Sequence, residues 1–146
     1  MPDDKTTQTK TQTAAELLVK CLENEGVEFI FGIPGEENID VMDALLSSSI
    51  KFVTCHHEQG AAFMADGLAR VTGLPGVCLV TSGPGATNLL TGVAAAYVAH
   101  SPVVVLVGGI AVEHYQKDAF QELDLLGMFR PVTKWAVQIT QPDRIP

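Results

Sequence analysis

The stretch that decides the fold runs from residue 77 to residue 107 and reads VCLVTSGPGATNLLTGVAAAYVAHSPVVVLV. Its two ends, VCLV and VVVLV, are continuously apolar, which is typical of strands buried on both faces of a sheet. Between the strands expected at 77–81 and 103–107, a Gly-rich turn leads into a helix expected over 86–99. A strand, a helix and a second strand in this order indicate a βαβ unit with parallel strands.

The same alternation extends along most of the chain. Thr13-Ala-Ala-Glu16 has the form of a capping box, which predicts a helix that starts there and ends at Gly26. The sequence therefore predicts an α/β fold of three layers, α/β/α, with a mainly parallel sheet. Its remaining elements are expected as strands at 27–31 and 51–55, helices at 38–46 and 57–71, a short helix at 119–126 and a last, edge strand at 134–139.

Charge and hydropathy exclude several classes of protein. Nine Lys and Arg residues stand against 17 Asp and Glu residues, a net charge of −8, so the chain repels nucleic acid and anionic lipid surfaces. No charged residue lies between Arg70 and Glu113, but Ser101-Pro102 divides this stretch into pieces too short to span a membrane. We therefore expect small-molecule or protein partners, with no nucleic acid and no membrane.

The two ends of the chain differ from its centre. Residues 1–12 are polar and lack the apolar run of a signal peptide, so we expect a flexible tail and a cytoplasmic protein. Residues 13–146 are expected to form one domain, and the apparent helix start at Gln141-Pro-Asp143 suggests that this domain is truncated. Three cysteines without CxxC spacing, Cys21, Cys55 and Cys78, are expected to be reduced core residues.

Three loops at expected strand ends carry unusual chemistry: 32–38, 55–60 and 81–88. The third has no Lys-Ser/Thr pair and places Asn88 where a dinucleotide fingerprint needs glycine, which disfavours a nucleotide site. The second begins like a zinc-protease helix, but Ala61 replaces the second histidine. Its Glu58 is, from spacing alone, better explained as a first-turn acid that is favoured by the helix dipole and needs no function.

A family resemblance rests on four motifs that occur in one order. Together they resemble the N-terminal pyrimidine-binding (PYR) domain of thiamine-diphosphate enzymes, most closely the acetolactate synthase large subunit. The resemblance runs from about residue 14 to the end of the chain and implies a thiamine-diphosphate-binding fold of the PYR type. The motifs are Phe31-Gly-Ile-Pro-Gly35, His57-Glu-Gln-Gly-Ala61, Thr81-Ser-Gly-Pro-Gly-Ala-Thr-Asn88 and Asp118-Ala-Phe-Gln-Glu122.

The resemblance implies roles for individual residues. In the family, the carboxylate that corresponds to Glu58 hydrogen-bonds N1′ of the cofactor's aminopyrimidine and helps to deprotonate the thiazolium ring. Gln121 is implied as a second catalytic residue that faces the reacting carbon. The pyrimidine pocket is implied to take Pro34, Gly35, Thr81, Pro84 and Asn88 together with Glu58, and the substrate site to take Glu36, Phe120 and Gln121.

The resemblance also implies partners outside these residues. The family's GDG…Asn element for Mg²⁺ and diphosphate does not occur here, so Mg²⁺ is expected in a separate diphosphate-binding domain, and no residue of this chain is expected to bind metal. Full activity is expected to need at least a dimer, for which the helix at 57–71 is a candidate surface. Whether FAD is also bound stays open.

The implied reaction is decarboxylation of pyruvate and transfer of its two-carbon unit to a second 2-keto acid, with the fragment alone inactive. Glu36 departs from the family, whose biosynthetic members usually have a second glycine there. The sequence therefore leaves open another thiamine-diphosphate decarboxylase, an acyl-CoA lyase, or a non-catalytic PYR subunit that only binds protein.

Overall fold

The computed structural model describes residues 11–146, which form an α/β fold. The strands are β1 (Phe29–Gly32), β2 (Lys51–Thr54), β3 (Gly76–Val80) and β4 (Val103–Val107). The helices are α1 (Ala14–Asn24), α2 (Ile39–Leu45), α3 (Glu58–Thr72), α4 (Pro84–Val98) and α5 (Leu125–Phe129). Eight of these nine elements lie within two residues of the expected bounds at each end, and α1 has the predicted capping box.

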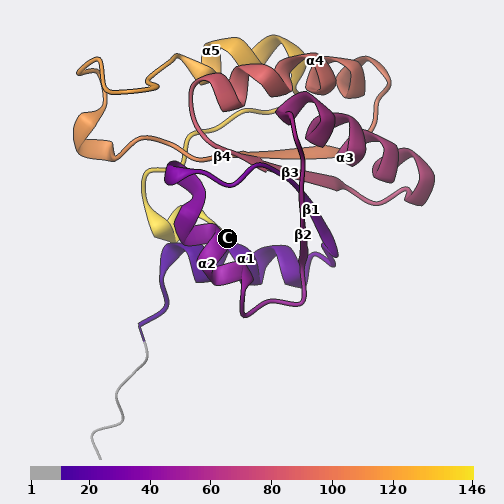
Figure 1. The fold of residues 1–146 in the computed structure, drawn as a ribbon, viewed down its shortest axis with the longest axis horizontal. Coiled ribbons are helices and arrows are strands. Elements are labelled where there is room, and N and C mark those ends of the chain that lie inside the picture. The colour runs from indigo at the N-terminus through magenta and orange to yellow at the C-terminus, as the bar shows by residue number, and fades with distance from the viewer. Residues whose placement is uncertain (1–10) are drawn as a thin grey trace, which may run out of the picture.

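The four strands form one parallel sheet in the order β2-β1-β3-β4. Figure 1 shows α1 and α2 on one face of this sheet and α3, α4 and α5 on the other. The predicted three-layer α/β/α architecture with a parallel sheet is therefore confirmed. β2 and β4 are the edge strands, and β3 lies in the interior with all five of its residues buried.

Each face of the sheet has its own apolar core because successive side chains of β3 point to opposite faces. Cys78 and Val80 pack against α3, α4 and α5, whereas Val77 and Leu79 pack against α1 and α2. Cys78 is fully buried and burial raises the pKa of its thiol to about 12, so it behaves as a small apolar side chain. All three cysteines are free thiols, as predicted, although Cys21 and Cys55 are only partly buried.

Helices α3 and α4 approach each other closely along small residues. A β-carbon placed on Gly92 of α4 would lie 2.5 Å from the β-carbon of Ala62 in α3, well inside van der Waals contact. Ala61, Ala65 and Ala69 of α3 are also buried. Much of the small-residue surface of α3 is therefore used within the domain, while Phe63 and Met64 remain 44% and 42% exposed.

Two further sequence predictions concern the N-terminal tail and membrane-spanning helices. The expected tail at 1–12 falls mostly on residues 1–10, which lie outside the described residues. Within residues 11–146, the helices are too short or too polar to cross a bilayer.

The helix predicted at 119–126 is wrong, because the helix in this region is α5 and residues 119–124 form a turn. The Glu122 carboxylate accepts hydrogen bonds from the backbone N–H groups of Gln116 and Ala119, which fixes a non-helical backbone. Asp124 then caps α5 by accepting from the N–H of Gly127 at 2.9 Å.

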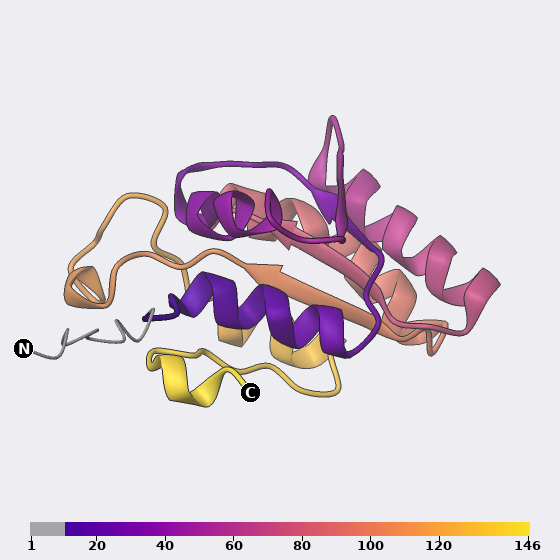
Figure 2. The same cartoon turned by 90° about the horizontal axis from the view of Figure 1, so that it is seen from below.

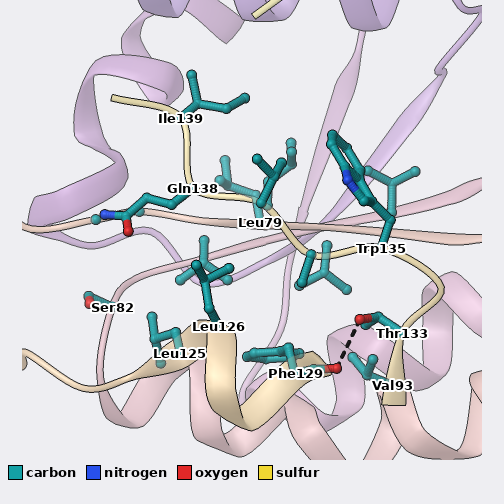
Figure 3. Close-up of a pocket in the computed structure, with 18 of the residues that line it drawn as sticks. Leu79, Ser82, Val93, Leu125, Leu126, Phe129, Thr133, Trp135, Gln138 and Ile139 are labelled. Atoms are coloured by element: carbon teal, nitrogen blue, oxygen red, sulfur yellow. Dashed lines mark hydrogen bonds between the residues drawn. The ribbon is translucent and has the colours of Figure 1, made fainter. Parts of the chain in front are cut away.

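The edge strand predicted at 134–139 is also wrong, since these residues pair with no strand of the described chain. The segment and β4 both line a cavity of about 1300 Å³, and Figure 3 shows Trp135, Gln138 and Ile139 of the segment at this cavity. Trp135 is 77% exposed, and Thr133 ties the segment to α5 by donating to the carbonyl oxygen of Phe129 at 2.8 Å.

Two glycine-to-alanine substitutions in these helices should change stability in opposite directions. Gly92→Ala forces α3 and α4 apart at Ala62 and is expected to lower the free energy of unfolding by about 1–3 kcal/mol. Gly67→Ala in α3 meets open space and is expected to raise it by about 0.5–1 kcal/mol. Urea unfolding of both variants measures these free energies. A change of the same sign and size in both variants would contradict the close contact between Gly92 and Ala62.

Candidate functional site

The candidate site lies where the chain direction reverses across the sheet. From β1 the chain moves outward to β2 and then returns to β3 on the other side of β1. The loops after the neighbouring strands β1 and β3 therefore lead to opposite faces of the sheet and leave a crevice between them. In open α/β sheets, ligands bind in such a crevice beyond the carboxyl ends of the strands. The loops at 33–38, 55–57 and 81–83 all follow strand ends at this edge of the sheet.

Glu58 and Asn88 meet where the first turns of α3 and α4 lie side by side. His57 caps α3 by accepting the N–H of Gln59 at its Nδ1 atom, so Glu58 is the first residue of the helix. Asn88 lies one turn into α4 and donates from Nδ2 to Oε2 of Glu58 at 3.0 Å. Glu58 is partly buried, and its Oε1 atom accepts no hydrogen bond from the described residues. One carboxylate oxygen is thus held while the other is available to a ligand.

Two glycines lie against Thr81, and one of them also lies beside this carboxylate. A β-carbon on Gly85 would lie 2.5 Å from Oγ1 of Thr81 and 3.6 Å from Oε1 of Glu58. A β-carbon on Gly35 would lie 2.1 Å from Cγ2 of the same threonine. The loops after β1 and β3 can therefore approach closely only because Gly35 carries no side chain, and Gly85 likewise leaves room for the Thr81 hydroxyl.

Gln121 reaches the site from the segment after β4, which projects from the body of the molecule in both views (Figures 1 and 2). Ser82 donates from its hydroxyl to the carbonyl oxygen of Gln121 at 3.4 Å. A β-carbon on Gly83 would lie 2.7 Å from the β-carbon of Gln121. The Oε1 atom of Gln121 is buried and has no hydrogen-bond partner among the described residues.

The structure brings together only some of the predicted site residues. Glu58 bonds to Asn88, Gly85 lies beside both Glu58 and Thr81, Gly35 packs on Thr81, and Gln121 packs on the adjoining turn. The side chains of Pro34, Glu36, Pro84 and Phe120 are exposed, and Phe120 is 82% exposed.

Several site features were not predicted from the sequence. These are the bond between Glu58 and Asn88 and the contacts of Ser82, Gly83 and Gly85. The Gly-Pro-Gly pattern was the available signal for a close approach at this turn.

The large cavity beside β4 is a separate feature. Neither Glu58 nor Asn88 lines it, and its walls come mainly from β4, α5 and residues 132–140. Among residues 11–146, no three His, Cys, Asp or Glu side chains gather as a metal site. The polar groups around Gly85 are the Glu58 carboxylate, the Asn88 amide and the Thr81 hydroxyl.

Comparison with known proteins decides the family. Residues 12–128 match the family described as "Thiamine pyrophosphate enzyme, N-terminal TPP binding domain". The chain belongs to this family. Thiamine pyrophosphate is thiamine diphosphate, so the resemblance inferred from the four motifs is confirmed, and the three-layer fold agrees with it.

Among curated relatives, the chain is similar to acetolactate synthases. It is 51% identical over 132 residues to the probable acetolactate synthase large subunit of Methanocaldococcus jannaschii, covering 90% of this chain and 22% of that protein. It is 49% identical over 135 residues to the isozyme 3 large subunit of Escherichia coli, covering 92% and 24% respectively. The catabolic acetolactate synthase of Raoultella terrigena is 47% identical over 131 residues, with coverages of 90% and 23%. The chain thus spans about a quarter of these relatives.

The crevice of this PYR domain fits part of thiamine diphosphate. A flat aminopyrimidine ring presents both acceptor nitrogens and an amino group, and the crevice offers a carboxylate oxygen, a hydroxyl and an amide. Gly85 leaves room above Glu58 that a side chain would fill.

Gly83→Ala should push Gln121 away from the turn after β3. Gly83 has a φ of 52°, and an added β-carbon would meet both the β-carbon and the carbonyl oxygen of Gln121. We expect a loss of about 1–3 kcal/mol in the free energy of unfolding and faster proteolysis after residue 113. Gly109→Ala, where an added β-carbon meets open space, is the matched control and should stay within about 0.5 kcal/mol. A Gly83→Ala variant as stable as this control would refute the contact.

Proposed function

We propose that this PYR domain is the N-terminal cofactor-binding part of an acetolactate-synthase-like enzyme. The full-length protein would decarboxylate pyruvate and transfer the two-carbon unit to a second 2-keto acid, which makes it a transferase. The names of the similar proteins support this reaction class. The observation that carries the proposal is the Glu58 carboxylate, held at one oxygen by Asn88 and open at the other beside Gly85.

Glu58 is the proton-handling residue in this proposal. The amide of Asn88 fixes the carboxylate so that Oε1 faces the space beside Gly85, where it can share a proton with a ring nitrogen. Asn88, Thr81, Gly35, Pro34 and Pro84 would hold the pyrimidine ring. When bound, thiamine diphosphate supplies the nucleophilic carbon and the electron sink for decarboxylation.

The substrate would be met by residues of two loops. Gln121 is already packed against Ser82 and Gly83, and its unpartnered Oε1 atom is a ready acceptor for a polar group of the reacting complex. Phe120 and Glu36 are exposed and would contact substrate when a further part of the protein covers them. Gln121 is therefore proposed as the second catalytic residue, with Phe120 and Glu36 as substrate-contacting residues.

The rest of the cofactor requires other protein. We propose that a diphosphate-binding domain holds the diphosphate and Mg²⁺, and that a second subunit completes the site. The exposed Phe63 and Met64 of α3 would face that subunit, which would also shield Glu58 from water. These 146 residues alone are then inactive, and the enzyme would act in the cytoplasm. FAD would occupy a further domain where it is present.

A second reaction within the same chemistry is favoured by one residue. Glu36 is an exposed carboxylate on the short 3₁₀ turn Glu36–Asn38 after β1. A charged side chain at the substrate entrance would change which substrate or acceptor fits there, so another thiamine-diphosphate decarboxylase or an acyl-CoA lyase is the alternative. Analysis of the products formed from pyruvate, with and without a second 2-keto acid or an acyl-CoA, separates these reactions.

Glu58→Gln in the full-length enzyme should abolish turnover while the fold stays intact. The amide cannot exchange a proton with the cofactor ring, so kcat should fall by at least about 10²-fold. Steady-state kinetics with pyruvate and thermal unfolding measure the two effects.

The matched control is Glu25→Gln, an exposed glutamate at the end of α1, which should leave kcat unchanged. Near-normal turnover of Glu58→Gln would rule out the proton-handling role of this residue.

A further inference from the structure

The turn that carries Phe120 and Gln121 is closed by one carboxylate. Glu122 accepts the backbone N–H of Gln116 at Oε1, at 2.5 Å, and that of Ala119 at Oε2, at 3.0 Å. The N–H of Glu122 in turn donates to the carbonyl oxygen of Ala119 at 3.0 Å. These backbone hydrogen bonds, first that from Gln116 and then that from Ala119, lower the pKa of Glu122, so the carboxylate stays ionised at neutral pH.

The backbone of this turn is strained. Gln116, Asp118 and Gln121 have φ values of 60°, 53° and 64°, in the left-handed region that side chains disfavour. Three such residues within six positions persist only where the surrounding structure holds them, and such strain concentrates at functional sites. Both oxygens of Glu122 bind inside this segment, so this carboxylate holds its backbone from within, while Ser82 holds Gln121 from outside.

The turn delivers Gln121 to the candidate site. Its carbonyl oxygen accepts from the hydroxyl of Ser82, its β-carbon lies over Gly83, and its Oε1 atom is buried without a partner among the described residues. A buried acceptor without a partner can bind a ligand group only if the backbone holds it in one place. Phe120, the preceding residue, is carried outward on the same turn.

We propose that Glu122 is a positioning residue: its carboxylate locks residues 116–121 in the conformation that presents Phe120 and Gln121 to the 2-keto acid. This proposal rests on the proposed function. Glu122 touches neither cofactor nor substrate and acts through the two residues that precede it. Its loss should therefore affect use of the 2-keto acid and leave binding of the cofactor at Glu58 and Asn88 intact.

The kinetic test uses the full-length enzyme with Glu122→Ala and Glu122→Gln. A misplacement of the turn should lower kcat/KM for pyruvate by about 10- to 100-fold in the alanine variant, with the KM for thiamine diphosphate unchanged. The glutamine variant keeps one acceptor oxygen and should lose less. Glu113→Gln is the matched control, since it lies on the same segment and its carboxylate has no hydrogen bond within residues 11–146.

A double variant separates positioning from general damage. If Glu122 acts through Gln121, then Gln121→Ala combined with Glu122→Ala should cost little more than the larger single effect. Fully additive losses, or a parallel rise in the KM for thiamine diphosphate, would overturn the proposal.

Hydrogen exchange tests the anchor independently of catalysis. The amides of Gln116 and Ala119 should exchange faster in Glu122→Ala but not in Glu113→Gln, and unchanged exchange would overturn the anchoring. Inactivity of the unsubstituted enzyme on every 2-keto acid would instead overturn the proposed function, and with it the assignment of this turn to substrate.

Discussion

The close contact of α3 with α4 is the constraint on which the site depends. Ala62 and Gly92 meet one turn beyond Glu58 and Asn88, so the same faces of the two helices make both contacts. The absence of a side chain at Gly92 sets the separation at which the amide of Asn88 reaches the carboxylate of Glu58. Packing of small residues in the core therefore fixes the geometry of a polar pair at the end of the sheet.

The architecture was predictable because burial leaves a strong pattern in the sequence. β3 and β4 are apolar without alternation, as expected of parallel strands, although only β3 is fully buried, and the glycines and the capping box mark where elements begin and end. The predictions failed after β4. There the backbone follows a carboxylate that binds N–H groups three and six residues earlier, and the segment at 134–139 has a strand-like composition without a strand beside it.

For the candidate site, the sequence predicted which loops contribute and which family they resemble, but not which side chains meet. Glu58, Asn88, Thr81 and Gly35 could each be named from their motifs, but the hydrogen bond between residues 58 and 88 spans 30 positions and depends on how α3 and α4 pack. The approach of Gln121 to Gly83 depends on a turn with left-handed residues that no local propensity favours. Local rules therefore identified the residue types, and tertiary contacts determined which of them meet.

The two edge strands of the sheet, β2 and β4, are unequally protected against pairing with another molecule. β2 begins with Lys51, whose ammonium lies 5.7 Å from the ring centre of Phe29, and a cation on an outer strand discourages pairing with another molecule. β4 is entirely aliphatic, and its free backbone groups face a hollow. When these residues are produced by themselves, the unpaired edge of β4 can form β-sheet hydrogen bonds with another molecule. Aggregation of the separate domain would therefore begin at β4.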